Sequence, residues 1–346
     1  MSDKTQYDHK GRPGIKAVAA LAGVGIASVS RVLSGQPGSS PALTQRVLDA
    51  AHTLGYTPNV LAQGLRRKST RSIGFVGSDI TNPLIASIVR GAESVLSLAD
   101  FSVLLTNSGG TANIDAERIE LLLQRQVDGL IVLPSLEDDP ATLTALRTTH
   151  TPIVLLDRSL PLDIPAHYVL SDHSQGIGEA THHLLSLGHR RIGLIVGTDV
   201  RPSRERIRAM ELAYDERNIP KDIIIDHGVL SEEHGKTALE AMLNLEYPPT
   251  AIVLGGNQLL GGALEVIHKK ELKLGSDISL VSCDDVPLSR FHQPPIATVM
   301  RDASLLGAQA ARLLLSHLKA AGAPETVHLP TWFEARASCG PCKSTI

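Results

Sequence analysis

Hydrophobic residues near the start of the chain recur at the spacing of short helices. The first run has apolar side chains at i, i+3, i+4 and i+7, which share one helix face: Ile15, Val18, Ala19 and Ala22. Gly23 then permits a tight turn. A second apolar stripe follows at Val29, Val32 and Leu33. Two short helices joined by a Gly-containing turn are typical of a helix-turn-helix that reads DNA, although any small helical hairpin has the same periodicity.

The opposite face of the second helix would face a partner, and it carries Ile26, Ala27, Ser28 and Arg31. A third helix follows, in which Ser40 and Pro41 suit the N-cap and the first helical position and Gly55 suits the C-terminal end. Its apolar stripe is Leu43, Val47, Ala51 and Leu54. We therefore expect a helical domain at residues 14–58, preceded by a flexible arm at residues 1–13.

Residues 59–71, NVLAQGLRRKSTR, predict a short helix and a linker. Asn59 can cap this helix, and basic residues at its end suit the helix dipole or a phosphate. Gly64 inside so short a helix costs about 1 kcal/mol relative to Ala. The helix is therefore expected to be marginal alone and could need DNA to form.

From Ile73 the pattern changes to short apolar strands that alternate with amphipathic helices, in two successive rounds. Continuous apolar strands between helices predict parallel sheets covered on both faces. The predicted strands are 73–78, 102–107, 129–134, 153–158, 168–172, 191–197, 222–228, 251–256 and 278–285; the predicted helices are 84–98, 116–126, 141–148, 175–187, 204–217, 234–245 and 259–269.

The fold class is therefore α/β: an all-helical head and two doubly wound parallel-sheet lobes. We expect the two-lobed body at residues 72–338, with an N-lobe of about 72–171 plus 300–330 and a C-lobe of about 172–299. In such sheets a ligand binds at the carboxyl ends of the strands, and between lobes where there are two.

The charge distribution separates the head from the body. Residues 1–71 contain ten Lys or Arg against three Asp, whereas the whole chain has a net charge of −3. A basic head on an acidic body suits a polyanionic partner for the head alone. A solvated basic tail is the alternative, but these charges are interleaved with apolar helical stripes.

The ends of the chain suggest no export and no redox chemistry. The first residues are polar without an apolar segment, and no apolar run reaches the roughly 18 residues that cross a bilayer, so we expect a cytoplasmic protein without a membrane partner. Cys339-Gly-Pro-Cys342 copies a thioredoxin motif, but redox chemistry of this kind needs a following helix. Residues 339–346 are therefore expected to be a frayed tail.

With these patterns in place, the chain resembles the LacI/GalR family of transcription regulators from about Ile15 to Arg336. The resemblance rests on the order and spacing of several motifs: AGVGIASVSRVLSG (22–35), LGYTPNVLAQGL (54–65), NPL (82–84), LDR (156–158), SLGHRRIGLIVG (186–197), CDD (283–285) and QPPIATVMRD (293–302). It implies a helix-turn-helix head and a body with the fold of periplasmic sugar-binding proteins.

The resemblance implies that the head binds double-stranded operator DNA as half of a homodimer. Ile26 and Ala27 would begin the recognition helix, where apolar side chains suit thymine methyl groups. Residues 59–65 would lie in the minor groove, with Leu65 as a wedge between base pairs, unless it only packs against its dimer mate. The implied DNA-binding residues are Lys16, Ile26, Ala27, Ser28, Ser30, Arg31, Asn59, Ala62, Gln63 and Leu65.

The resemblance also places an effector between the lobes. Carboxylates would accept paired hydroxyls of a sugar-like ligand, and Arg206 would donate to it in a fork. Arg206 could instead be a surface residue, and Asp284 could be a loop cap. The implied effector-binding residues are Leu84, Ile85, Asp157, Asp172, Arg206, Leu230, Asn257 and Asp284.

Two departures from the family pattern affect these expectations. Gly25 stands where the family usually has Ser at the N-cap of the recognition helix, a change that costs little. Gly255-Gly256-Asn257 replaces the usual Asn-Asp pair, which puts Asn257 in doubt as a ligand. The identity of the effector therefore should not be borrowed from well-known family members.

The sequence thus predicts a repressor whose operator affinity responds to a small molecule. A binding protein without DNA function would have no use for the head. An enzyme is disfavoured because no G-x-G-x-x-G follows residues 73–78, no Walker motif occurs, and the histidines lack metal-ligand spacing. We expect no cofactor and no metal, and a dimer by default, since no long heptad tail follows.

Overall fold

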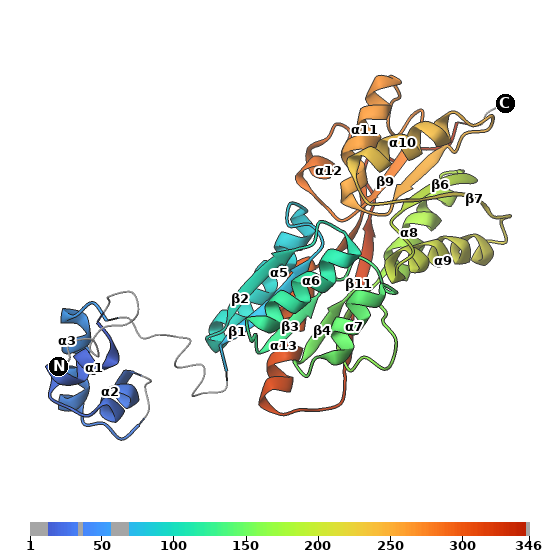
Figure 1. Ribbon diagram of the computed structural model, residues 1–346. Helices are drawn as coiled ribbons and strands as arrows, with labels where there is room; N and C mark the ends of the chain where they lie inside the picture. The colour runs from blue at the N-terminus through green and yellow to red at the C-terminus, as the bar shows by residue number, and fades with distance from the viewer. Residues whose placement is uncertain (1–12, 34–36, 57–68, 344–346) are drawn as a thin grey trace. The chain divides into compact units, whose positions relative to one another are not determined.

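The computed structural model describes residues 13–33, 37–56 and 69–343 (Figure 1). The chain forms two compact units, Met1–Thr70 and Arg71–Ile346. The predicted DNA contacts Asn59, Ala62, Gln63 and Leu65 lie outside the described residues. Among the described residues, no single helix is long and apolar enough to cross a membrane; the first two helices pass that test only as a pair bent by 104°, by length and composition.

In its described residues, the first unit contains the helices α1 (Ile15–Ala22), α2 (Ile26–Leu33) and α3 (Pro41–Thr53). Gly23 adopts φ 65°, the left-handed conformation that ends α1, and its N–H bonds the carbonyls of Ala19 and Ala20. The Ser40 hydroxyl accepts from the Leu43 N–H at 3.3 Å and so caps α3. Val18, Val29, Val47, Ala19, Ala22, Ala50 and Ala51 form the core. The predicted helical periodicity is therefore the periodicity of the buried face.

The N-lobe of the second unit has a parallel sheet in the order β2-β1-β3-β4-β5. Its strands are β1 (Ser72–Gly77), β2 (Ser102–Asn107), β3 (Gly129–Val132), β4 (Ile153–Leu156) and β5 (His167–Asp172). The helices are α5 (Pro83–Leu96), η1 (Ser97–Ala99), α6 (Ala112–Gln124) and α7 (Pro140–Thr148). One buried cluster lies beneath α5 and another beneath α6 and α7, because the apolar strands expose both faces of the sheet to helices.

The C-lobe repeats this plan in the order β10-β9-β8-β6-β7. Its strands are β6 (Arg191–Val196), β7 (Asp222–His227), β8 (Ala251–Leu254), β9 (Ser279–Cys283) and β10 (Ala297–Arg301). Its helices are α8 (His173–Ser186), α9 (Arg201–Glu216), α10 (Glu232–Leu243), η2 (Asn257–Leu259), α11 (Leu260–Lys269) and α12 (Pro287–Phe291). Helices α8 and α9 cover one face, and α10 and α11 the other (Figure 1).

The last strand, β11 (Thr326–Glu334), belongs to both lobes. Its first half pairs in parallel with β5, and its second half pairs antiparallel with β10, so it runs from one lobe into the other (Figure 1). The prediction of purely parallel sheets is wrong at this pair. Helix α13 (Ala303–Lys319) returns to the N-lobe and packs on α5. Their backbones touch at glycines: a Cβ on Gly91 would lie 1.9 Å from the Ser304 carbonyl oxygen.

The prediction of a frayed tail is wrong for residues 339–343, which pack against the C-lobe. The Gly340 carbonyl accepts from His189 Nε2 at 3.1 Å, and the Cys342 N–H donates to the Leu187 carbonyl at 2.8 Å. Burial raises the pKa of the Cys339 thiol to about 12, so this thiol is not a reactive thiolate. These contacts order the tail. The sequence did not reveal them, because the partner residues lie far away in the chain and no local pattern signals such contacts.

Candidate functional site

The exposed side of α2 carries the residues predicted to contact DNA bases. Ile26 is 40% exposed, Ala27 and Arg31 are exposed, and Ser28 and Ser30 are half-buried. Lys16, at the start of α1, is also exposed. The Gly25 carbonyl accepts from the N–H groups of Ser28 and Val29, so the backbone begins α2 at the predicted residue without a capping side chain. An exposed Ile at the start of a helix whose opposite face packs on the core through Val29 suits contact with a base edge.

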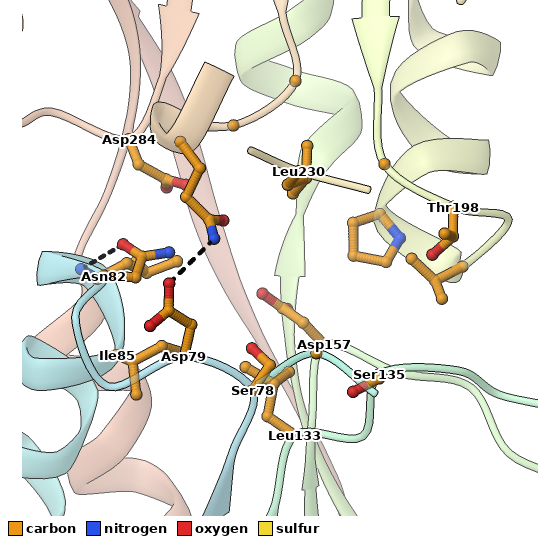
Figure 2. Close-up of a pocket in the computed structure, with 18 of the residues that line it drawn as sticks. Ser78, Asp79, Asn82, Ile85, Leu133, Ser135, Asp157, Thr198, Leu230 and Asp284 are labelled. Atoms are coloured by element: carbon orange, nitrogen blue, oxygen red, sulfur yellow. Dashed lines mark hydrogen bonds between the residues drawn. The ribbon is translucent and has the colours of Figure 1, made fainter. Parts of the chain in front are cut away.

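A cavity of about 570 Å³ lies between the two lobes of the second unit. Loops that follow the carboxyl ends of strands in both lobes form its walls, as expected for doubly wound sheets. Figure 2 shows Asp79 and Asn82 on one side, Ser135 and Thr198 on the other, and Asp157 between them. This volume is within the usual range for small-molecule sites.

Seven of the eight predicted effector residues line this cavity: Leu84, Ile85, Asp157, Arg206, Leu230, Asn257 and Asp284. Asp172 is not among the lining residues. Its carboxylate accepts from the Ser174 N–H at 3.0 Å and caps α8. The expectation that Asp172 faces the ligand is therefore corrected: this aspartate begins a helix, which is a frequent role of Asp at the end of a strand.

Arg301, the last residue of β10, organises the floor of the cavity and was missed in the sequence analysis. Its Nε donates to Asp284 Oδ1 at 2.6 Å and its Nη2 to Asp284 Oδ2 at 3.1 Å, a bidentate pair. Its Nη1 donates to Asp157 Oδ2. Both predicted carboxylates are therefore held by one guanidinium that joins the two lobes.

The surroundings of Asp157 favour its ionised form. Burial alone would raise the pKa of this carboxyl, but the Arg301 charge, His173 and the backbone N–H of Ser171 together hold the pKa well below its usual range. Burial lowers the pKa of His173 to about 4, with help from Arg206 and against Asp157. At neutral pH the floor therefore holds an ionised Asp157 beside a neutral His173.

Arg206 lies in α9 and is one of the residues that line the cavity. The residue is only 5% exposed, and within the described ranges its Nε has no hydrogen-bond partner. Its Nη2 lies 3.4 Å from Nδ1 of His173. The alternative that Arg206 is a surface residue is wrong, because this residue is buried. The neighbouring Arg204 and Arg208 are the exposed arginines of this stretch of the helix.

Side-chain amides join the lobes at one side of the cavity. Asn257 Nδ2 donates to Asn82 Oδ1 at 2.9 Å, and Gln258 Nε2 lies 3.5 Å from Asp79 Oδ2 (Figure 2). Among the described residues, the buried Asn257 Oδ1 has no hydrogen-bond partner. Asn257 thus links the two lobes through its amide nitrogen.

Glu137, in the loop after β3, joins the lobes at another point. This carboxylate is only 8% exposed; it accepts from the N–H groups of Ser159 at 2.8 Å and Arg201 at 3.0 Å, and from the Arg204 guanidinium. Residue Val200 offers no capping side chain to α9. An N-lobe carboxylate therefore caps a C-lobe helix, a contact that exists only while the lobes stay together.

A helical unit with an exposed recognition face and a two-lobed unit around a ligand-sized cavity define a class, the ligand-responsive DNA-binding regulators. Among the described residues, no group of three or more His, Cys, Asp or Glu side chains could hold a metal ion.

Comparisons with known proteins agree with this class. Residues 14–59 match the family model "Bacterial regulatory proteins, lacI family", and residues 181–339 match a periplasmic binding protein-like domain. The HTH-type transcriptional repressor PurR of Actinobacillus pleuropneumoniae serotype 3 is 31% identical over 307 residues, which is 88% of this chain and 91% of that protein. The chain belongs to the LacI family and is a transcriptional regulator, as its relatives are, not an enzyme.

Two solved structures extend the likeness to the whole fold. The lac repressor dimer bound to operator and the anti-inducer ONPF superposes with a TM-score of 0.84 at 26% identity, covering 95% of this chain and 99% of that one. The transcriptional regulator CelR–cellobiose complex has a TM-score of 0.71 at 28% identity and covers 94% and 100%. The fold is therefore that of the lac repressor, with its DNA-binding head and its two-lobed domain.

Proposed function

We propose that this chain is a repressor that binds a pseudo-palindromic operator as a homodimer through residues 15–68, and that a small, polyhydroxylated molecule bound between the lobes controls the affinity. The observation that carries the proposal is the cavity: seven residues selected from sequence motifs converge on it, in the chain that also bears the exposed face of α2. The operator-bound dimer and the cellobiose complex among the structural neighbours support both partners.

In the proposed DNA complex, Ile26 and Ala27 contact base edges, and Lys16, Ser28, Ser30 and Arg31 add polar and phosphate contacts. Thymine methyl groups are the base features that suit Ile26 and Ala27. Replacement of these two residues should therefore change which operator is preferred, whereas replacement of Lys16 should weaken binding to all sequences and reduce its salt dependence.

The cavity also suggests how a ligand changes DNA affinity. It lies at the carboxyl ends of the strands, whereas the chain from the head joins the N-lobe at Ser72, the amino end of β1. A ligand that favours one arrangement of the lobes acts through the crossover strands, where Arg301 joins Asp157 and Asp284. Couplings of this kind are typically about 1–3 kcal/mol.

The experiment has two stages. An unbiased selection of duplex DNA with the full-length protein should yield a two-fold symmetric site, bound with a strong salt dependence. A thermal-shift screen of sugars and their derivatives should then find a compound that changes affinity for that site. The variant Leu230→Trp, which fills the cavity, should abolish the thermal shift, and Leu245→Trp, on an exposed leucine after α10, should keep it. Absence of any selected sequence would refute the proposal.

A further inference from the structure

The loop after β7 forms part of the C-lobe wall of the cavity. Residues 228–231 connect β7 to α10, and Val229, Leu230 and Ser231 line the cavity. Val229 is 64% exposed, whereas Leu230 (Figure 2) is half-buried and packs on a buried cluster of the C-lobe. The position of Leu230 therefore sets the shape of this part of the wall.

Two glycines leave room for the Leu230 side chain. A Cβ on Gly256, after β8, would lie 3.1 Å from Leu230 Cδ1, and a Cβ on Gly197, after β6, would lie 3.4 Å from Leu230 Cγ. Gly256 has φ −173°, which is extended backbone that any residue adopts, so the close approach of Leu230 is what favours glycine there. Because Leu230 fits between these two backbones, a displacement of the loop would leave a gap in the wall.

A hydrogen-bonded pair of side chains spans the base of this loop. His234 Nε2, in α10, lies 2.7 Å from Asp226 Oδ1, in β7. Because a carboxylate only accepts hydrogen bonds, His234 Nε2 carries the hydrogen and donates it. The other ring nitrogen, Nδ1, is buried and has no partner among the described residues. Within that part of the chain, the bond to Asp226 is therefore the one hydrogen bond that holds this imidazole.

The imidazole of His234 in turn lies against the backbone of the loop. A Cβ on Gly228 would lie 2.7 Å from both Cε1 and Nε2 of His234, closer than a Cβ can approach, so only glycine fits beside this ring. The Gly228 N–H donates to the Val196 carbonyl at 3.2 Å, and the His234 N–H donates to the Ser231 hydroxyl at 3.1 Å. The pair therefore contacts the loop at its first residue and at its last.

We propose that Asp226 and His234 are positioning residues of the cavity, whose hydrogen bond holds the loop 228–231 so that Leu230 forms the wall against which a ligand packs. This inference rests on the proposed function of the cavity. It adds two residues that do not contact the ligand, because neither Asp226 nor His234 is among the lining residues. A binding residue on a loop is placed precisely only where supporting side chains fix the loop.

The exposure of the pair separates positioning from stability. The Asp226 side chain is 39% exposed, and hydrogen-bonded charges so close to solvent contribute little to the stability of a fold. Loss of the pair should therefore change the loop and the affinity for a ligand much more than it changes the Tm.

The first test needs no ligand and follows the loop by NMR in the full-length protein. In His234→Ala and in Asp226→Ala, the Gly228 amide should exchange with deuterium at least about tenfold faster than in the wild type, and the methyl order parameters of Leu230 should fall. The Gly255 amide, which donates to a carbonyl of β6 at 2.7 Å in the same lobe, should keep its exchange rate.

Lys236→Ala is the matched control for these variants. It removes another ion pair of α10, in which Lys236 Nζ lies 2.6 Å from Glu265 Oε1, and it should leave the exchange of the Gly228 amide unchanged. An unchanged Gly228 amide in both His234→Ala and Asp226→Ala would overturn the proposal, and so would an equal acceleration in Lys236→Ala.

A double-mutant cycle tests the contact between the ring and the loop. Gly228→Ala should lower the Tm of the wild type, because its Cβ overlaps the His234 ring. In the His234→Ala background the same substitution should leave the Tm unchanged or raise it, because the overlap is gone and alanine restricts the unfolded chain. An equal fall in both backgrounds would show that His234 does not bear on the loop and would contradict the proposal.

The last test measures binding, with glucose, ribose and cellobiose as probes. For each probe that raises the Tm of the wild type, His234→Ala should raise the Kd about tenfold in calorimetry, while its Tm without probe stays within about 2–4 °C of the wild type. His234→Gln, whose amide nitrogen can donate to Asp226 in place of Nε2, should restore most of the affinity. An unaltered Kd in His234→Ala would overturn this inference but leave the proposed function intact. Failure to select any DNA sequence would refute the proposed function, whatever the behaviour of the loop.

Discussion

Asp157 and Asp284 occupy equivalent positions in the two lobes, and their surroundings differ. Each follows a strand beside the crossover, each has a positive φ, 47° and 65°, and each donates its N–H to the next strand, to the carbonyls of Val169 and Val299. Asp157 also accepts from Ser171 N at 2.5 Å and Ser171 Oγ at 3.1 Å. Within the described residues, Asp284 accepts only from Arg301.

This difference shows that the two carboxylates depend on Arg301 unequally. The carboxylate of the N-lobe aspartate is held by Ser171 and by Arg301, whereas among the described residues that of the C-lobe aspartate accepts from Arg301 alone. Arg301 is therefore required more by the C-lobe carboxylate than by the N-lobe carboxylate. Variants that remove Arg301, Asp157 or Asp284 test this difference between the lobes.

Loss of Arg301 should have the largest effect. Arg301→Met leaves two buried carboxylates without their counter-ion, so the free energy of unfolding should fall by about 3–5 kcal/mol in urea denaturation. Arg290→Met, which removes an exposed arginine paired with Asp285, is the control and should cost about 1 kcal/mol or less. Equal effects of the two variants would show that Arg301 does not hold the lobes together.

Loss of the carboxylate charges should show the inequality directly. Asp157→Asn leaves Arg301 and the Ser171 hydroxyl with a weaker acceptor in a buried loop, and it should cost about 3 kcal/mol. Asp284→Asn should cost less, about 1.5 kcal/mol, because fewer groups of its own lobe contact it. The free energies of unfolding of the two variants, measured side by side, decide this; a larger loss for Asp284→Asn would reverse the comparison.

The third prediction is a pH dependence of stability. The folded pKa of His173, about 4, lies below its ordinary value of 6.5, so the unfolded chain takes up the proton first. The free energy of unfolding should therefore fall by about 1.4 kcal/mol per pH unit for this group as pH drops from 6.5 towards 4. The contribution of Asp157, whose pKa is lowered, persists above its unfolded value and is lost only at more acidic pH.

The variant His173→Gln isolates this effect, because His167, His183 and His189 also have lowered pKa values and add to the slope of the wild type. In this variant, we expect the slope of the free energy of unfolding against pH, between pH 6.5 and 4, to be smaller than in the wild type by the contribution of one titrating group, about 1.4 kcal/mol per pH unit. An unchanged slope would mean that His173 is not held neutral beside Asp157.

The smallest loss in the free energy of unfolding should come from replacing Glu137 with Gln. Glu137→Gln keeps an oxygen for the two backbone N–H groups but loses the charge that faces Arg204, which is half-exposed, so we expect a cost of about 0.5–1 kcal/mol. Glu137→Ala also uncaps α9 and should cost about 1–2 kcal/mol. Thermal melts of both variants test whether Glu137→Ala loses more stability than Glu137→Gln. An equal loss would show that the hydrogen bond from the Arg201 N–H to Glu137 does not stabilise the protein.

The sequence predicted the regular elements of both units well, because their apolar positions are periodic. The helices α1, α2 and α3 and the strands β1 to β9 lie within a few residues of their expected positions, and the short helix expected from Asn59 lies outside the described residues. Strands β10 and β11 and helices α12 and α13 were not assigned. In β11, Pro330 lies where pairing with β5 ends and pairing with β10 begins, and a proline within an apolar run argues against a strand by local rules.

The candidate site was predictable where it follows strand ends and unpredictable where it depends on distant partners. Motif positions selected seven lining residues, yet Arg301 bonds Asp157 from 144 positions away in the chain, and no local pattern signals such a pair. The same holds for the C-terminal residues that pack on the C-lobe. Asp172 was misassigned because an Asp at a strand end suits both a ligand and a helix cap.

The central claim is that this LacI-family chain binds one DNA sequence selectively and that a ligand in its cavity changes the affinity for that sequence. The most direct test measures fluorescence anisotropy of the selected duplex and of a scrambled duplex at one fixed salt concentration, with and without the compound found in the thermal-shift screen. We predict a preference for the selected duplex of at least about 10³-fold and a change of about 5–150-fold on addition of the compound, absent in Leu230→Trp. Equal affinity for both duplexes, or a response that survives in Leu230→Trp, would contradict the account.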